Sequence, residues 1–281
     1  MRNYFESRKI IIATKHQKEQ VIAPLLSHEL GLSCFVPDNF DTDRFGTFSG
    51  EVKRTHDALE TARLKCLAAC EQFQTDLAIA SEGSFGMHPD LFFLSADTEI
   101  LYLLDLKNSC SWHTIEISTK TNFSGAYVES QEELMMFAQA AQFPTHALIL
   151  KPSQEATENL IKGIKSEKDL ITAFNQLKSK HKKVFVETDM RAMHNPTRMS
   201  VIGKATLKLI DKLKSLCPVC KSPGYSVNIV KSGLPCADCG EPTEAALWHV
   251  YTCSYCQFAD TKKYPHGKMY QDPMYCQKCN P

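Results

Sequence analysis

Eight of the twelve cysteines stand in four pairs of the form C-x-x-C close to the carboxyl terminus. The pairs are Cys217 and Cys220, Cys236 and Cys239, Cys253 and Cys256, and Cys276 and Cys279. Two thiolates separated by two residues lie on one tight turn, at the spacing that a tetrahedral zinc ion requires, and two such turns complete a site. The spacing therefore predicts two zinc ions. Because sulfur fills every ligand position, we expect both ions to be structural.

The pairing of the four turns is left open by their spacing. The intervening segments hold 15, 13 and 19 residues, and each length is compatible with a ribbon hairpin. Sequential pairing would join the first two C-x-x-C turns in one site and the last two in the other. We favour it because each half then has its own turn sequence, KSPG or YPHG. A nested or crossed pairing is the alternative.

The bulk composition indicates a soluble protein with no general attraction to polyanions. The 281 residues are 43 % hydrophobic, which is enough for one large domain or two of unequal size. The 32 basic residues balance 32 acidic ones, so the whole chain offers no electrostatic funnel for nucleic acid or an anionic membrane. The first residues lack the apolar length of a signal peptide or membrane span. We therefore expect a cytoplasmic protein without a membrane partner, in a compartment where zinc is favoured over disulfides.

Apolar runs alternate with segments of helical periodicity along most of the chain. The expected strands lie at residues 9–13, 76–80, 91–107, 112–121, 146–150 and 183–187, and the expected helices at 18–30, 59–73, 131–142, 153–181 and 197–216. This alternation predicts an α/β domain at residues 8–214, with a mixed sheet flanked by helices. The cysteines define a small zinc-ribbon domain at residues 215–281.

Two carboxylates near the expected helix at 59–73 and the strand at 76–80 could hold a divalent cation. Glu60 lies at the start of that helix, and Glu82 follows the strand in the Gly-bounded sequence SEGSFG. Ligands of open α/β sheets bind beyond the carboxyl ends of the strands, and carboxylate oxygens suit Mg²⁺. In the plainer interpretation, Glu60 completes a capping box with Asp57, and Glu82 is a solvated loop residue.

Several short motifs resemble those of the inosine and xanthosine triphosphate pyrophosphatases, in the same order along residues 8–214. The segment ETARLKC, from Glu60, is similar to the family's helix motif E-N-A-x-x-K-A, and ASEGS, with Glu82, is similar to the strand end D-D-S-G. The segment ATKHQK resembles T-N-P-x-K, and ETDMRAMHNPTRM stands where the family has a basic segment of the S-H-R type. The chain departs from these motifs by having Thr61 and Lys15 in place of Asn and Ser81 in place of the first Asp.

The resemblance implies a nucleotide pyrophosphatase-like fold that hydrolyses a nucleoside triphosphate to monophosphate and pyrophosphate with Mg²⁺. It implies catalytic roles for Glu60, Glu82 and Lys18, and substrate-binding roles for Thr14, Arg191 and Arg198. The two glutamates would be the metal ligands, and the lysine would stabilise charge on the leaving pyrophosphate. Phe123, in the turn KTNFSG, could stack on a base or simply extend the core.

A second hypothesis is a non-catalytic binding protein with a nucleotide fold. In that case the zinc ribbons would contact nucleic acid or a protein partner. The departures from the pyrophosphatase motifs favour this alternative, whereas the presence of Glu60, Glu82 and Lys18 favours the enzyme. The tail from Cys217 has six lysines and five acidic residues, so it shows no evident basic patch.

Overall fold

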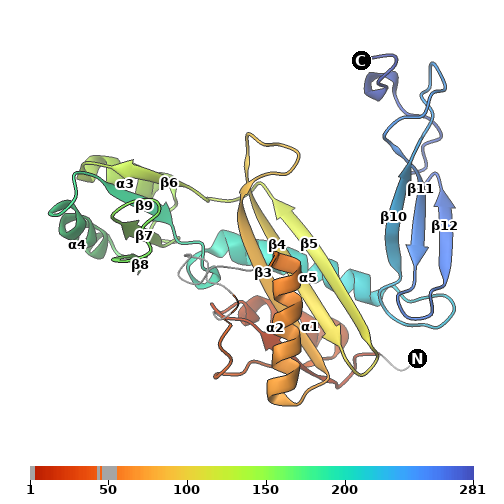
Figure 1. Cartoon of the computed structure of the whole chain (residues 1–281), viewed down its shortest axis with the longest axis horizontal. Helices are drawn as coiled ribbons and strands as arrows, with labels where there is room; N and C mark the ends of the chain where they lie inside the picture. The colour runs from red at the N-terminus through yellow and green to blue at the C-terminus, as the bar shows by residue number, and fades with distance from the viewer. Residues whose placement is uncertain (1–3, 43–44, 46–55) are drawn as a thin grey trace. The chain divides into compact units, whose positions relative to one another are not determined.

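The computed structural model describes residues 4–42, 45 and 56–281. The chain forms two compact units, one ending at Leu209 and the other running from Ile210 to Pro281. The division falls within helix α5, Pro196–Lys214 (Figure 1). Among the described residues, no helix has the length and apolar character needed to cross a lipid bilayer.

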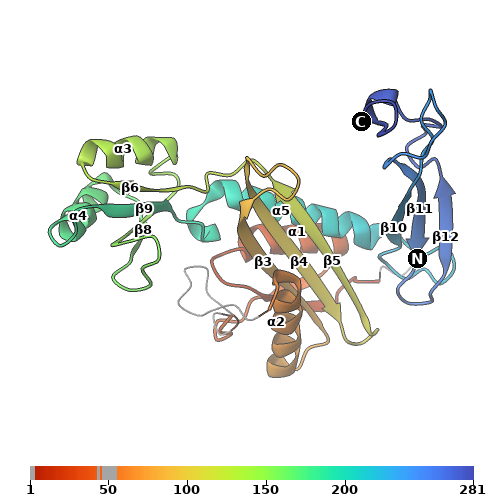
Figure 2. The ribbon, with the colours of Figure 1, turned by 45° about the horizontal axis from the view of Figure 1, so that its top comes forward.

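A five-stranded sheet forms the centre of the first unit, in the order β2-β1-β3-β4-β5. Its strands are β1 Lys9–Ala13, β2 Ser33–Phe35, β3 Leu77–Met87, β4 Ser95–Asp105 and β5 Cys110–Ser118. Strand β1 is parallel to both neighbours, whereas β3, β4 and β5 form an antiparallel meander. The strands expected at residues 91–107 and 112–121 correspond to β4 and β5, which pair as an antiparallel hairpin. Helix α2, Ala58–Phe73, covers one face of the sheet, and α5 lies on the other (Figure 2).

Capping residues mark the end of α1 and the start of α2. Helix α1, Glu19–Leu30, stops at Gly31, which has a left-handed φ of 68°. Helix α2 starts after Asp57, whose carboxylate accepts the backbone N–H of Glu60 at 2.8 Å. The expected apolar stripe of α2 packs on the sheet, with Ala62, Cys66 and Ala69 fully buried.

A separate four-stranded antiparallel sheet follows in the order β6-β9-β7-β8. Its elements are β6 Gly125–Val128, β7 Leu148–Lys151, β8 Ile161–Ile164 and β9 Val184–Thr188, with helices α3 Gln131–Ala140 and α4 Glu167–Lys178. The first unit thus has helices flanking two sheets, not the single mixed sheet that we expected. The expected helix at 153–181 is also wrong, because its first half contains β8. Ser166 starts α4 by accepting the N–H of Asp169.

Strand β3 is longer than the sequence predicts and places Glu82 inside the sheet. Its pairing with β1 ends at Ala80, but its pairing with β4 continues to Met87. The expectation that Glu82 lies in a loop is therefore wrong, because β4 supplies hydrogen-bonding partners along the whole of β3. Beyond Ala80 the opposite edge of β3 is no longer paired with β1.

The second unit is built on an antiparallel meander of three strands. These are β10 Ser226–Ser232, β11 Ala246–Thr252 and β12 Ala259–Lys263, and a 3₁₀ turn, Pro273–Tyr275, precedes the last cysteine pair. Most residues of β10 and all residues of β12 are exposed. The unit therefore has little apolar core of its own.

Candidate active site and metal centres

A cluster of buried charged side chains surrounds the part of β3 that extends past β1. Each member is at most 7 % exposed, and the members are Lys18, Lys65, Glu82, Asp97, Glu99 and Arg198. Burial of charged groups is costly unless they are paired or used in function. Such a concentration in one region therefore makes it a candidate functional site.

The cluster reaches both faces of the sheet. Glu82 lies opposite Ile100, whereas Glu99 lies opposite Gly83. Because cross-strand neighbours share a face and successive residues alternate, Glu82 and Glu99 point to opposite faces. On the α2 side, Lys65 forms an ion pair with Glu82. At the strand edge, Lys18 Nζ donates to the carbonyl and hydroxyl oxygens of Ser81, each at 3.1 Å.

Arg198 is held firmly on the other face. Its Nε donates to Glu99 Oε1 at 2.6 Å, and its Nη1 donates to the carbonyl oxygen of Met190. Its backbone N–H is bound by the side chain of Asn195 at 2.9 Å, which caps α5. The guanidinium carbon also lies 5.0 Å from the centroid of the Phe85 ring. The position of Arg198 is therefore fixed by contacts in several directions.

Gly83 has no side chain, which leaves room on β3 for the ion pair between Arg198 and Glu99. A Cβ at Gly83 would overlap Arg198 Nη2 and lie 2.5 Å from Glu99 Oε1, whereas one at Gly86 would meet no atom within 4 Å. We predict that Gly83→Ala destabilises the protein by about 1–3 kcal/mol through overpacking. Gly86→Ala on the same strand is the control and should stay close to the parent. Urea unfolding measures both, and equal stabilities of the two variants would contradict the arrangement.

Burial shifts the proton affinities of two members in opposite directions. It lowers the pKa of Lys18 to about 8; the positive charge of Arg198 adds to this, while Glu99 and Glu82 oppose it. Burial raises the pKa of Asp97 to about 7; the negative charge of Glu99 adds to this, while Arg198 and Lys18 oppose it. Both groups therefore titrate near neutral pH, as acid–base and ligand groups of active sites often do.

The carboxylates Asp97 and Glu99 on β4 have oxygen atoms that lack hydrogen-bond partners among the described residues. Neither oxygen of Asp97, nor Oε2 of Glu99, accepts a hydrogen bond from any residue that the structure describes. Both side chains are essentially inaccessible to bulk solvent. Buried, unsatisfied carboxylate oxygens carry a large desolvation penalty, which a cation would relieve.

The structure brings together only some of the residues proposed from sequence. Lys18, Glu82 and Arg198 belong to the cluster. Glu60 instead accepts two hydrogen bonds of 2.7 Å from Arg63 on its own helix. The hydroxyl of Thr14, which is half-buried after β1, donates to the adjacent Lys15 carbonyl at 3.2 Å.

Arg191 has a partner that fixes the chain just before α5. Its Nη2 lies 2.5 Å from Oδ2 of Asp189, a completely buried carboxylate that also accepts the Gly163 N–H at 3.1 Å. Arg191 therefore supports the turn that leads to Arg198, and its own guanidinium is already paired.

Asp97 and Glu99 were missed at the sequence level. The signal was present in SADTEILYLLD, where Asp97 and Glu99 at i and i+2 share one face of the strand and directly precede the apolar run ILYLL. The apolar residues of this run predict only a strand, at residues 91–107. Acidic residues at consecutive inward positions of a buried strand should have marked a site.

The eight paired cysteines form two four-sulfur clusters in the second unit. In one, Sγ of Cys217 lies 3.7 Å from that of Cys256, and Sγ of Cys220 lies 3.6 Å from that of Cys253. In the other, the Cys236–Cys279 and Cys239–Cys276 distances are 3.8 and 3.7 Å. Tetrahedral zinc with bonds of ~2.3 Å places its sulfur ligands about 3.8 Å apart. The two clusters therefore fit structural zinc ions.

The sequential pairing that we favoured is wrong. The first C-x-x-C turn shares a cluster with the third, and the second shares one with the fourth. One strand of the antiparallel meander separates each turn from the next. Consecutive turns therefore fall at opposite ends of the sheet, and alternate turns meet.

The four turns share one backbone conformation. The carbonyl of the first cysteine of each pair accepts the N–H four residues later, from Lys221, Gly240, Gln257 and Asn280. The distances are 3.0, 3.1, 3.0 and 2.8 Å. Three of these donors have a left-handed φ, namely Lys221, Gly240 and Gln257. The repeated turn presents both thiols of each pair to the same point.

Residues 65–281 match the family model described as "Domain of unknown function (DUF6671)". The chain belongs to this family. The matched region contains both four-cysteine clusters and every member of the charged cluster except Lys18. No curated protein matches the chain. The DUF6671 family description assigns no activity, so the functional argument depends on the site itself.

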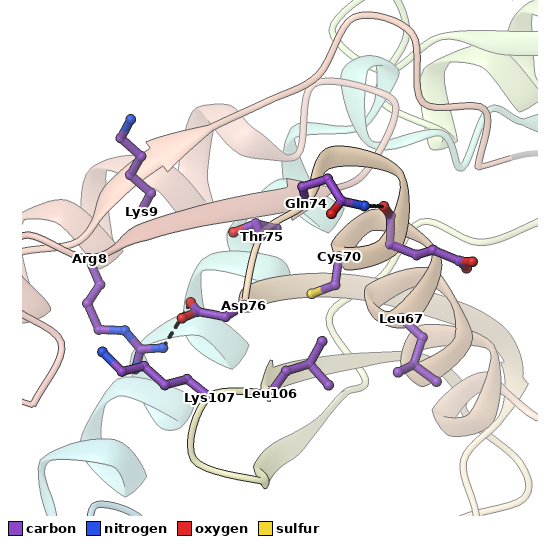
Figure 3. Close-up of a pocket in the computed structure, with 10 residues that line it drawn as sticks. Arg8, Lys9, Leu67, Cys70, Gln74, Thr75, Asp76, Leu106 and Lys107 are labelled. Carbon is purple, nitrogen blue, oxygen red and sulfur yellow. Dashed lines mark hydrogen bonds and ion pairs between the residues drawn. The ribbon is translucent and has the colours of Figure 1, made fainter.

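A shallow hollow of about 930 Å³ lies at the other end of the same sheet (Figure 3). It is lined by Arg8, Lys9, Leu67, Cys70, Glu71, Gln74, Thr75, Asp76, Leu106 and Lys107. Arg8 is already paired with Asp105 at 2.6 Å and with Asp76 at 3.1 Å. Burial raises the pKa of Cys70 to about 11, so this thiol is a poor nucleophile. The charged cluster is the better candidate site of this DUF6671 protein.

Proposed function

We propose that the first unit hydrolyses a nucleoside triphosphate to the monophosphate and pyrophosphate with Mg²⁺. The observation that carries this proposal is the buried pair Asp97 and Glu99, with unsatisfied oxygens, beside the buried cations Lys18 and Arg198. A metal-bound triphosphate is a ligand that needs both kinds of group, since its cation requires oxygen ligands and its phosphates require positive charge.

Asp97 and Glu99 are the proposed protein ligands of the metal. Among the described residues, no three acidic side chains bring ligand oxygens within 4.8 Å of one another. Mg²⁺ needs no such cage, because it commonly uses one or two carboxylates together with waters and substrate phosphates. Bound there, the ion would neutralise the phosphates and polarise the phosphorus that is attacked. Substrate and metal should therefore bind cooperatively.

The cations have distinct proposed tasks. Lys18 is a point charge that can follow a phosphate oxygen as charge develops on the leaving pyrophosphate. Arg198 is fixed by Glu99 and Met190 and would hold one phosphate orientation.

Glu82 and Phe123 keep proposed roles in this scheme. The ion pair with Glu82 holds Lys65 on the α2 side of the sheet, close enough to Lys18 for its charge to support phosphate binding. The ring of Phe123 lies 5.6 Å from that of Phe85, centroid to centroid, and is 37 % exposed. This partly exposed aromatic pair offers a stacking surface beside the charged cluster.

The second unit is proposed to be a structural module that docks to a protein. From Cys217 onward it carries six lysines and five acidic residues. Two zinc ions held by eight thiolates contribute four further negative charges, so the loaded module has a net charge of about −3. This charge favours a protein partner over nucleic acid.

The test is to incubate the protein with Mg²⁺ and a panel of canonical and deaminated nucleoside triphosphates, and to separate the products by anion-exchange chromatography. Monophosphate with pyrophosphate is the expected product pair. Diphosphate with phosphate would contradict attack at the α-phosphorus. Binding without any product would favour the alternative of a nucleotide-binding protein that is not an enzyme.

A further inference from the structure

The tip of the β3–β4 hairpin exposes an unusual amount of apolar surface. Met87 is 76 % exposed, Phe92 72 % and Phe93 78 %, and Leu91 and Leu94 are also exposed. Five large apolar residues within eight positions are therefore offered to solvent together. Soluble proteins rarely present such a patch unless it contacts something.

The tip is organised by its own hydrogen bonds. Nδ1 of His88 accepts the backbone N–H groups of Asp90 and Leu91, both at 3.1 Å. The N–H of His88 donates to the carbonyl of Leu94 at 2.8 Å. These bonds close the turn, and Phe92 and Phe93 lie at its tip. The exposure is thus part of a defined turn conformation.

The tip directly continues the candidate active site. Gly83, Phe85 and Met87 share one face of β3 because side chains alternate along a strand. The first contacts Arg198 and Glu99, the second lies against Arg198 and Phe123, and the third begins the tip. From Gly83 to Met87 the strand rises about 14 Å. Along this distance the side chains on this face change from buried and charged, through aromatic, to exposed and apolar.

A nucleotide has chemical groups in the same order as the side chains along this face of β3, with charged phosphates at one end and an aromatic base at the other. We propose that Phe92 and Phe93 form a clamp that closes on the base of a nucleotide whose phosphates occupy the charged cluster. The ring faces would stack on the base, which removes their apolar surface from water. This inference rests on the proposed function and identifies the part of the chain that contacts the base.

Two other occupants fit the tip less well. Residues 84–98 contain no lysine or arginine, whereas segments that insert into anionic membranes usually have basic flanks. A second copy of the chain would bury the apolar tip, but the continuity of the tip with the charged cluster would then have no use. The oligomeric mass measured in the experiment below distinguishes a second copy of the chain from a nucleotide.

The test compares a ligand that has a base with one that lacks it. The variant Phe92→Ser/Phe93→Ser and the parent are titrated calorimetrically, with Mg²⁺, against α,β-methylene nucleoside triphosphates and inorganic tripolyphosphate. The variant is expected to bind the best analogue about 5-fold to 100-fold more weakly, because stacking of the base on the aromatic rings is lost. Its affinity for tripolyphosphate should be unchanged.

Met136→Ser is the matched control, because Met136 is 72 % exposed on α3. Its affinities should equal those of the parent. An unchanged nucleotide affinity in the double variant, or an equal loss for both ligands, would overturn the clamp. A parent that binds neither ligand, or a change in oligomeric mass on gel filtration that accounts for the loss, would also overturn it. Binding of the analogue without turnover of any hydrolysable nucleotide would leave the clamp standing and refute the hydrolytic function.

Discussion

The variant Cys220→Ser/Cys253→Ser is expected to retain one zinc ion per chain, whereas Cys220→Ser/Cys239→Ser should retain none. The first variant removes two sulfurs from a single cluster, and the second removes one sulfur from each. A three-sulfur site loses zinc far more readily than a complete one. Zinc content measured by elemental mass spectrometry after dialysis distinguishes them. Sequential pairing would give the reverse result, and that outcome would contradict the crossed arrangement.

Complete removal of zinc by a chelator is expected to unfold the second unit. Structural zinc contributes ~10 kcal/mol or more to small domains of this kind, and the exposed strands β10 and β12 offer little burial to replace it. Hydrogen exchange should show loss of protection in β10, β11 and β12, while β3 and β4 stay protected. Retained protection in the second unit without zinc would show that the ions do not hold its fold.

Asp97→Asn is expected to abolish Mg²⁺-dependent turnover and yet stabilise the metal-free protein at pH 8. The pKa of Asp97 is raised from 3.8 to about 7 by burial and by Glu99. Between these two values the unfolded chain releases a proton that the folded chain keeps, so stability falls as pH rises. At pH 8 the full penalty is present, and the neutral amide avoids it.

The measurement is Tm in EDTA at pH 8 and at pH 4. The gain should be several degrees at pH 8, since 1 kcal/mol corresponds to about 2–4 °C for a unit of this size, and it should vanish at pH 4. Asp105→Asn is the control of opposite sign. Burial raises the pKa of Asp105, but hydrogen bonds from Arg8 and Asn108 outweigh this and leave it below its usual value. Asp105→Asn should therefore lose stability at pH 8. Destabilisation by Asp97→Asn would contradict the absence of hydrogen-bond partners at Asp97 in the described part of the chain.

At the zinc centres, the spacing of the cysteines was enough to predict the ligands, but their pairing depends on the strand topology. The C-x-x-C pattern alone identified all eight ligands, because two thiols on a tight turn have few other structural uses. The pairing required knowing that each intervening segment contributes one strand. Segments of 15, 13 and 19 residues fit one strand with its turns as well as they fit a short hairpin. Turn residues in KSPG and YPHG occur in either arrangement.

The charged cluster shows a similar limit. Local motifs indicated Lys18, Glu82 and Arg198, which come together from distant parts of the chain. Their partners Asp97 and Glu99 depend on the register of β3 against β4. Propensity does not reveal this register, because Gly83 and Gly86 look like turn residues until β4 is known to pair along the whole strand.

The most direct measurement is pyrophosphate release from the nucleoside triphosphate panel, with Mg²⁺ or with EDTA, by the parent, Glu99→Gln and Glu116→Gln. Glu116 lies directly opposite Glu99 on β5, but it is paired at the surface with Lys208 at 3.4 Å. The proposed function predicts Mg²⁺-dependent release by the parent and Glu116→Gln, and at least a 100-fold loss in Glu99→Gln, as a group that acts on the reacting phosphate should show. Equal release by all three proteins, or release from no nucleotide by the folded parent, would contradict it.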